Sequence, residues 1–320
     1  MQLKYTVMQI DKKNMKWGKN MKVEAVRSDK IYKKISLAKE EERNDIYRYE
    51  LMKPFEFKWK CVGVELKSEN GYDVVAMSTM GGGYNPSQIN ENNRVEIDNI
   101  SNDEFWKSCE ESIFNSLKGF EDHGIKLSIE NYIFTILLND PNNPMSAMTG
   151  DYCGDGGIPG YIIGTIIPNE TSMKMLPVAL AHETNHNVRW QFIKWSPNVT
   201  LADMIVSEGL AENFAALMFG EDKIGMWVKN TKIDDLKNII NPAIKENLYE
   251  KDFNKISAYL YGDEIMSMRG GETVGMPYCA GYACGYALIK YYLQKTGKNI
   301  YEATIIPTEE ILKETSEFWN

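Results

Sequence analysis

The sequence His182-Glu183-Thr184-Asn185-His186 constrains this chain more than any other feature, because it sets two imidazoles four residues apart with a carboxylate directly after the first. In a helix, residues four apart are offset by roughly 40° around the axis and about 6 Å along it. Both imidazoles can then reach one metal ion, while Glu183 can hydrogen-bond a water molecule on that metal. The spacing therefore predicts a zinc-binding helix with Glu183 as general base. The alternative is a surface helix with two solvated imidazoles.

A catalytic zinc site takes a third protein ligand and keeps one open position, whereas a structural site takes four protein ligands. The search for the third ligand starts after the first helix, which we expect to end near Ile193 before Pro197 turns the chain. Thr200 and Asp203 then form a predicted capping box that starts a second helix. That helix is expected to end at Gly220, a residue type favoured at helix C-termini.

Glu208 in this second helix is the predicted third ligand. It lies seven residues into the helix, and His186 lies seven residues before the end of the first, so an antiparallel hairpin sets the two at the same depth. Glu212 follows one turn later, where its carboxylate could accept the outer N–H of a zinc-bound imidazole. Each glutamate could instead be solvated. Gly209 and Ala211 are small and favour a close approach to the partner helix.

These motifs resemble known zinc metallopeptidases. His182-Glu183-x-x-His186 followed by Glu208-Gly209-x-Ala211-Glu212 looks like the gluzincin group, and residues 102–298 resemble a family of bacterial proteins described as predicted zinc-dependent proteases. The resemblance also includes Gly160-Tyr161-Ile162-Ile163, Arg189 and Gly281-Tyr282-Ala283-Cys284-Gly285-Tyr286. It implies one zinc ion (Zn²⁺) per chain, held by His182, His186 and Glu208, and a peptide or protein substrate.

The resemblance implies an α+β fold. A zincin-like core over residues 125–220 would have a small mixed sheet with an edge strand above the HExxH helix, and residues 221–320 would form a mainly helical lobe. Together, residues 101–320 are the predicted metallopeptidase domain, and residues 1–100 are a predicted N-terminal α/β extension of unknown role. In gluzincins the strand just before the zinc helix is an edge strand that pairs with extended substrate, which assigns that role to Tyr161–Ile167.

Related metallopeptidases often use a tyrosine or histidine from the C-terminal region to donate a hydrogen bond to the tetrahedral oxyanion. Tyr282 is the first candidate for this role, and Tyr278 and Tyr286 are the alternatives. All three could instead be packing residues. His123, the remaining histidine, is expected at the surface.

Several further elements are predicted from patterning. Hydrophobic periodicity predicts helices over Asp29–Glu50, over residues 102–120 and up to Lys295, and strands at Phe55–Val62, Tyr72–Ala76 and Tyr132–Leu138. Gly154–Gly160 lacks the Lys-Ser/Thr and the helix of a phosphate loop, so a turn into the next strand is expected there. Arg189 is expected in a buried ion pair with Glu212 or Asp203.

Composition bears on partners and location. The net charge of −9 arises from 45 acidic and 36 basic residues without a basic block, which argues against a nucleic-acid partner. The five cysteines include no CxxC pair and are expected to be free thiols. Met1–Val7 has no signal-peptide pattern, and no apolar run approaches the ~20 residues that span a bilayer, so we expect a cytoplasmic protein without membrane insertion.

The predicted reaction is peptide hydrolysis. Zinc lowers the pKa of the water at its fourth position, and Glu183 takes the proton as hydroxide attacks the carbonyl, then protonates the leaving amine. A catalytically silent, zinc-stabilised binding or regulatory protein is the alternative from another class. A hydrolase acting on a different carbonyl is a third possibility. The full set of residue types needed for turnover favours the peptidase.

Overall fold

The computed structural model describes residues 21–143, 146, 151–196 and 198–319. Pro197 and Met1–Val7, on which two of the predictions above depend, lie outside these described residues. The contacts divide the chain into two compact units. Unit 1 consists of residues 1–115 and 128–180, and unit 2 of residues 116–127 and 181–320. The division of the chain at residue 100 into extension and metallopeptidase domain stays a prediction.

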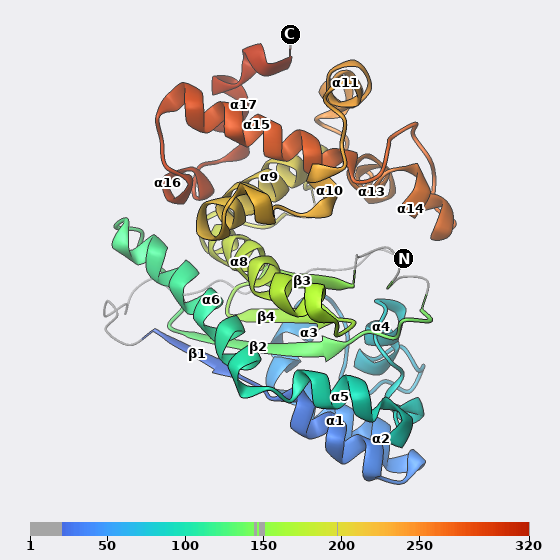
Figure 1. The fold of residues 1–320 in the computed structure, drawn as a ribbon. Coiled ribbons are helices and arrows are strands. Elements are labelled where there is room, and N and C mark those ends of the chain that lie inside the picture. Colours follow the sequence, from blue (N-terminus) through green and yellow to red (C-terminus); the bar gives the residue numbers. More distant parts are fainter. Residues whose placement is uncertain (1–20, 144–145, 147–150, 197, 320) are drawn as a thin grey trace. The chain divides into compact units, whose positions relative to one another are not determined.

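Unit 1 combines a small sheet with short helices (Figure 1). Its elements are β1 (Lys22–Ala25), α1 (Ser28–Leu37), α2 (Glu40–Ile46), η2 (Tyr47–Met52), η3 (Lys53–Phe55), α3 (Glu56–Cys61), α4 (Val74–Met80), η4 (Pro86–Gln88), η5 (Glu91–Asn93), α5 (Arg94–Ile100), β2 (Asn131–Leu138), β3 (Tyr152–Ile158) and β4 (Tyr161–Ile166). Two longer helices, α6 (Asp103–Asp122) and α8 (Glu170–Phe192), belong partly to each unit. The predicted elements at residues 102–120 and 132–138 are confirmed as α6 and β2.

The sheet has the strand order β1-β2-β4-β3 among the described residues. β1 and β4 run parallel to β2, and β3 runs antiparallel to β4. The prediction that Tyr161–Ile167 is an edge strand is therefore wrong, because β4 lies between two partners and β3 forms the edge. Gly154–Gly160, expected to be a turn, contributes most of β3. Only Pro159 and Gly160 remain to turn the chain, with Gly160 at a φ of 88°.

One face of this sheet is covered by α6 and by the first half of α8. The ring of Trp106 in α6 lies 5.8 Å from that of Phe134 in β2. A Cβ atom on Gly164 of β4 would lie 3.2 Å from a methyl group of Leu176 and 3.3 Å from one of Leu180. Phe134 and Gly164 share a face because Ile136 pairs with Gly164 and strand side chains alternate. The start of α8 is thus packed directly on the strand backbone.

Two predicted strands in unit 1 are helices. In the segment predicted as Phe55–Val62, the buried residues are Phe55, Lys58 and Trp59, whereas Phe57 is half exposed. That spacing is helical rather than alternating, and residues 56–61 form α3. The segment predicted as Tyr72–Ala76 is instead the start of α4.

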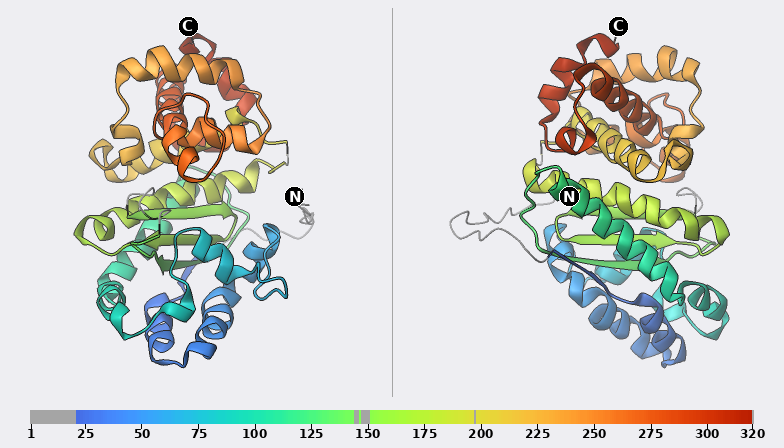
Figure 2. Two further views of the ribbon diagram at one scale, coloured as in Figure 1. Left: turned by 90° about the vertical axis from the view of Figure 1, so that its right-hand side faces the viewer. Right: turned by 60° about the vertical axis from the view of Figure 1, so that its left-hand side comes forward.

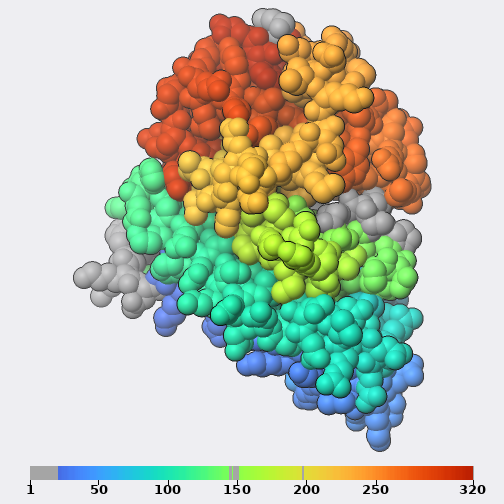
Figure 3. Space-filling view, viewed as in Figure 1, coloured from blue at the N-terminus to red at the C-terminus, as the bar shows by residue number. Residues whose placement is uncertain are grey.

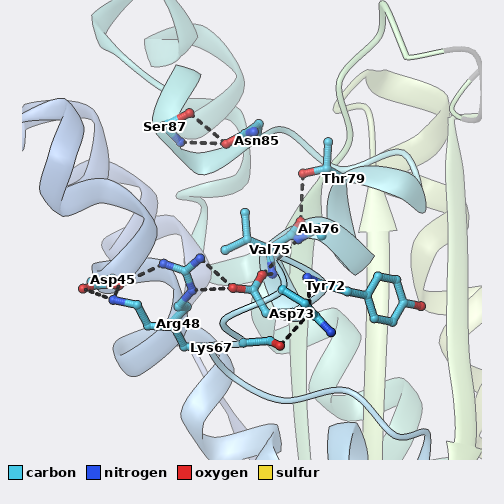
Figure 4. A network of polar contacts seen from close by, with 12 residues as sticks. Asp45, Arg48, Lys67, Tyr72, Asp73, Val75, Ala76, Thr79, Asn85 and Ser87 are labelled. Atoms are coloured by element: carbon cyan, nitrogen blue, oxygen red, sulfur yellow. Dashed lines mark hydrogen bonds and ion pairs between the residues drawn. The ribbon is translucent and has the colours of Figure 1, made fainter.

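Asp73 explains the second of these errors, because it caps α4. Its carboxylate accepts hydrogen bonds from the backbone N–H groups of Val75 and Ala76. It also forms an ion pair with Arg48. Arg48 in turn contacts Asp45, so a polar network ties η2 to the α4 cap (Figure 4). The helix predicted over Asp29–Glu50 is likewise divided into α1, α2 and η2, since Ala38 between α1 and α2 has extended dihedral angles.

Unit 2 is mainly helical, as expected for the C-terminal region, and the α+β fold class is confirmed. Its elements after α8 are α9 (Leu201–Phe219), η6 (Glu221–Lys223), α10 (Met226–Lys229), α11 (Ile233–Asp235), η7 (Leu236–Ile240), α12 (Asn241–Asn247), α13 (Phe253–Tyr261), α14 (Asp263–Met268), α15 (Ala280–Thr296), α16 (Ile300–Thr304), α17 (Thr308–Glu314) and η8 (Ser316–Trp319). α15 ends within a residue of the predicted Lys295. Both views in Figure 2 show α15 beside α9.

Two glycines bring α9 and α15 into backbone contact. A Cβ atom on Gly209 would lie 2.1 Å from the carbonyl oxygen of Gly285, and one on Gly285 would lie 2.3 Å from that of Ile205. Gly209 was expected to allow a close approach to the first helix of the hairpin. The close partner of Gly209 is α15.

None of the described helices is both long enough and apolar enough to cross a bilayer. The cytoplasmic location stays a prediction. All five cysteines are free thiols, as expected.

Candidate metal centre

Two adjacent helices of unit 2 present the candidate residues. α8 carries His182, Glu183 and His186, and α9 carries Glu208 and Glu212. The start of α9 is fixed by the predicted capping box, in which Thr200 and Asp203 bond reciprocally, and its end is at Gly220 with a φ of 99°. The predicted bounds of α9 are confirmed.

The second half of α8 is held by buried polar contacts to the C-terminal segment. Arg189 is 1% exposed and donates to the carbonyl oxygens of Thr304 and Ile306 and to the hydroxyl of Thr308. The predicted ion pair of Arg189 with Glu212 or Asp203 is therefore wrong. Burial lowers its pKa to about 10, although the charge of Asp203 acts in the opposite direction. Backbone carbonyls take the place of a carboxylate.

The three candidate ligands meet at one point. Nε2 of His182 lies 3.1 Å from Nε2 of His186 and 3.2 Å from Oε2 of Glu208, and the distance from His186 Nε2 to Glu208 Oε2 is 3.3 Å. All three side chains are about nine-tenths buried. Among the described residues this is a grouping of histidine and carboxylate that could hold a metal ion. Two imidazole nitrogens and one carboxylate oxygen thus form a nearly equilateral triangle.

The outer nitrogen of each imidazole has its own partner. His182 Nδ1 lies 3.1 Å from Oε2 of Glu212, the residue considered for this role from the sequence. His186 Nδ1 lies 3.0 Å from the hydroxyl of Ser207, which sequence reasoning did not assign. A hydrogen on each Nδ1 leaves each Nε2 lone pair free to face the triangle. Such outer partners commonly set the tautomer and orientation of metal-binding histidines.

Glu212 is itself held by residues that follow α9. Its Oε1 accepts the backbone N–H of Gly225, and its Oε2 accepts the indole N–H of Trp227 at 3.0 Å. Sequence reasoning missed both residues, because nothing in their spacing relates them to the HExxH motif. Glu212 is 2% exposed, and its carboxylate has three hydrogen-bond partners: Gly225, Trp227 and His182.

The electrostatics of the cluster favour positive charge. Burial lowers the pKa of His182, but its hydrogen bonds to Glu208 and Glu212 and the charge of Glu183 outweigh burial, so that its pKa lies well above the usual value. Burial raises the pKa of Glu208, but His186 and His182 outweigh it and bring that pKa to about 2. Carboxylates around two imidazoles therefore form an environment in which a cation is stabilised.

The donor set and its dimensions fit zinc. Zinc binds histidine nitrogen and carboxylate oxygen at about 2.0 to 2.2 Å, and tetrahedral ligands at that distance are about 3.3 to 3.6 Å apart. The observed edges of 3.1 to 3.3 Å are close to that separation. Two imidazoles with one carboxylate are also the ligand set of several catalytic zinc sites. His182, His186 and Glu208 would hold the ion.

Glu183 and the tyrosines have distinct surroundings. Glu183 is 9% exposed, and its negative charge helps to raise the pKa of His182. The ring of Tyr282 is 6.4 Å from that of Trp227 and 6.0 Å from that of Tyr261. The indole of Trp227 thus lies near the Tyr282 ring and also donates to Glu212.

Of the two alternative tyrosines, Tyr286 lies further along α15 and Tyr278 lies just before that helix. Tyr286 lines a pocket of about 490 Å³ with Val228 and Lys290, and the Lys290 ammonium lies 5.5 Å from the centre of its ring. Tyr278 is half buried and precedes Cys279, the N-cap of α15. His123 is exposed, as predicted, and its ring stacks on that of Tyr301.

Comparison with known proteins also points to zinc. Residues 105–313 match the family described as "Predicted Zn-dependent protease (DUF2268)", a range that covers about two thirds of the chain. The chain belongs to this family. All candidate ligands of this family member, and the segment that holds Glu212, lie inside the matched range.

A relative matches over a still longer range. The chain is 32% identical over 290 residues to the uncharacterized protein YjfC of Bacillus subtilis (strain 168), which covers 90% of this chain and 96% of YjfC. No solved structure matches the chain. Membership of the family of predicted zinc-dependent proteases therefore rests on sequence, and the triangle of ligand atoms is an independent structural observation.

Proposed function

We propose that this protein is a zinc-dependent peptidase of the gluzincin type, with one zinc ion held by His182, His186 and Glu208. The observation that carries this proposal is the triangle of two Nε2 atoms and one carboxylate oxygen, with edges of 3.1 to 3.3 Å. A bound zinc ion would polarise a carbonyl and lower the pKa of a water molecule. Three protein ligands leave a fourth tetrahedral position for that chemistry.

Glu183 is the proposed general base. It follows His182 on α8 and is offset by about 100° around the helix axis, so it lies beside the ligand triangle rather than in it. Its carboxylate takes a proton from the attacking water and delivers the proton to the leaving amine. The largely buried position of Glu183 strengthens its electrostatic interactions, because little water screens them.

Glu212 and Ser207 orient the imidazoles, and Tyr282 is the proposed oxyanion donor. The contact of Tyr282 with Trp227, whose indole bonds to Glu212, supports this choice over Tyr286, which lines the separate pocket with Lys290. Tyr278 stays the alternative. The proposed substrate is a peptide or protein.

The decisive experiment compares the wild-type chain with Glu183→Gln. Purified protein is analysed for zinc by mass spectrometry and assayed for cleavage of a diverse peptide library. We expect one zinc per chain in both proteins, cleavage by the wild type, and a loss of about 10³-fold in the variant. Tyr282→Phe should lower kcat with zinc retained.

Three outcomes would contradict the proposal. A Glu183→Gln variant as active as the wild type would remove Glu183 from the mechanism. A wild-type protein that binds zinc stoichiometrically but cleaves no library member would indicate a silent, zinc-stabilised binding protein. Cleavage of an ester or amide outside the peptide class would instead identify a different hydrolase.

A further inference from the structure

The segment after α9 has a role that goes beyond the ligands and their direct partners. It leads from Gly220 into α10 (Met226–Lys229) at the surface of unit 2, where it is coloured gold in Figure 3. Met226 is 56% exposed, and Trp227 is half buried. From this surface position the segment sends one backbone N–H and one indole N–H to the buried carboxylate of Glu212.

We propose that Trp227 is a positioning residue for the metal centre, acting through Glu212 on His182. This inference rests on the proposed function, because it assigns a determinant of metal affinity to that same site. The indole N–H of Trp227 and Nδ1 of His182 meet the same oxygen, Oε2 of Glu212, at 3.0 and 3.1 Å. The orientation of the carboxylate and that of the imidazole are thereby coupled.

The geometry around Glu212 leaves its carboxylate little rotational freedom. Oε1 is held by the N–H of Gly225 and Oε2 by His182 and Trp227. Loss of the indole N–H leaves His182 as the donor to Oε2, so the carboxylate can rotate about its hydrogen bond to Gly225. A rotated carboxylate no longer directs Nε2 of His182 toward His186, and the ligand triangle loosens.

Gly225 provides a second, independent way to test the coupling. Its φ of −59° and ψ of 149° are open to any residue, so alanine is tolerated by the backbone at this position. A Cβ atom there would nevertheless lie 2.0 Å from Cε2 and 2.4 Å from Nε1 of Trp227. Alanine at position 225 must therefore displace the indole while leaving every polar group of the cluster in the chain.

The test uses the full-length protein and measures zinc affinity by competition with a chromophoric chelator. Trp227→Phe keeps an aromatic ring and removes the N–H, and Trp195→Phe is the matched control because Trp195 packs against Trp190 instead. We expect Trp227→Phe to bind zinc at least tenfold more weakly. Trp195→Phe should stay within twofold of the wild type.

Two further readouts distinguish positioning from packing. The metal-free Trp227→Phe protein should stay folded and unfold somewhat below the wild-type temperature, because the ring contact with Tyr282 is retained but one hydrogen bond to a buried carboxylate is lost. With Co²⁺ in place of zinc, the visible absorption bands should differ from those of the wild type, since they report ligand geometry. Unchanged zinc affinity and an unchanged cobalt spectrum would overturn the inference, as would weaker zinc binding with an unchanged cobalt spectrum.

The Gly225→Ala variant completes the argument as a double-mutant cycle. Alone, it should weaken zinc binding by a factor similar to that of Trp227→Phe. In the Trp227→Phe background it should have little further effect on zinc binding, because the indole N–H through which it acts is already absent. Additive effects of the two substitutions would overturn the inference.

The outcomes separate this inference from the proposed function. A wild-type chain that binds no zinc would overturn both. Zinc binding that is insensitive to Trp227→Phe and Gly225→Ala would overturn the inference alone. Zinc binding that depends on both residues in a protein without peptidase activity would support the inference and contradict the proposed function.

Discussion

Oε2 of Glu208 lies 3.2 Å from Nε2 of His182, although 26 positions separate the two residues in the sequence. The contact requires that α8 and α9 form a hairpin with these residues at the same level. The capping box at Thr200 and Asp203 sets where α9 begins, and so determines which side chain reaches the histidines. A shift of α9 by one residue would rotate Glu208 by about 100° away from them.

Substitution of Glu208 by glutamine should remove most of the metal affinity. The amide keeps the size of the side chain but loses the charge that the two imidazoles and a cation stabilise. We expect less than one tenth of the wild-type zinc content after dialysis against a weak chelator. Glu221→Gln, at an exposed glutamate paired with Lys290, is the control and should retain zinc. Full zinc occupancy in Glu208→Gln would show that the third ligand is another residue.

Ser207→Ala should weaken zinc binding by about tenfold, because His186 loses the hydroxyl partner of its Nδ1. The loss is measured as a change in the zinc dissociation constant. Ser257→Ala is a matched control, since Ser257 bonds only to a carbonyl of its own helix among the hydrogen bonds described. Equal affinities of wild type and Ser207→Ala would indicate that packing alone orients His186.

The metal-free protein should lose stability as the pH rises above neutrality. The pKa of His182 is raised in the folded chain, so its contribution to stability is fully present below about pH 6.5 and is lost as the pH rises through the folded pKa. Thermal unfolding with EDTA, followed from pH 6 to pH 9, should therefore show a falling midpoint. His182→Ala should show a smaller fall, and an identical fall in both proteins would contradict the assignment.

The same linkage has the opposite sign for Glu208. Its pKa of about 2 means that its contribution is present above its unfolded value and is lost as the pH falls toward 2. The metal-free protein should thus be most stable in weakly acidic solution, between the windows in which the two contributions are lost.

Arg189→Met should destabilise the chain by on the order of 3 kcal/mol, because buried carbonyl groups of the C-terminal segment lose their donor. The free energy of unfolding is measured by urea titration at constant pH. Arg94→Met, at an arginine that is 81% exposed and pairs with Asp98, should change it by less than about 0.5 kcal/mol. Similar losses in the two variants would mean that the Arg189 contacts contribute little.

Much of the α8 and α9 hairpin could be predicted from the sequence, because its determinants are local. The HExxH spacing, the capping box and Gly220 each act within a few residues. The level match of His186 and Glu208 follows from helix geometry once both ends are known. Local patterns therefore suffice where two consecutive helices bring the residues together.

Contacts with distant segments could not be predicted in this way. Arg189 was expected to find a carboxylate, whereas its partners are carbonyl oxygens more than a hundred residues away. Gly225 and Trp227 bond to Glu212 through a backbone turn that has no hydrophobic period. The strand predicted at residues 55–62 failed because alternation of apolar and charged residues in a short segment also fits a helix that buries Lys58 and pairs its ammonium with Asp155.

The missing side chains at Gly209 and Gly285 have a consequence for how sequences of this family can vary. The two helices meet through main-chain atoms at this crossing, directly beside Glu208, so their separation there helps to set where that carboxylate lies. Volume-conserving exchanges of apolar residues away from this crossing should alter the separation of the two helices less. A single added methyl group at the crossing, by contrast, would force the helices apart and change the metal site.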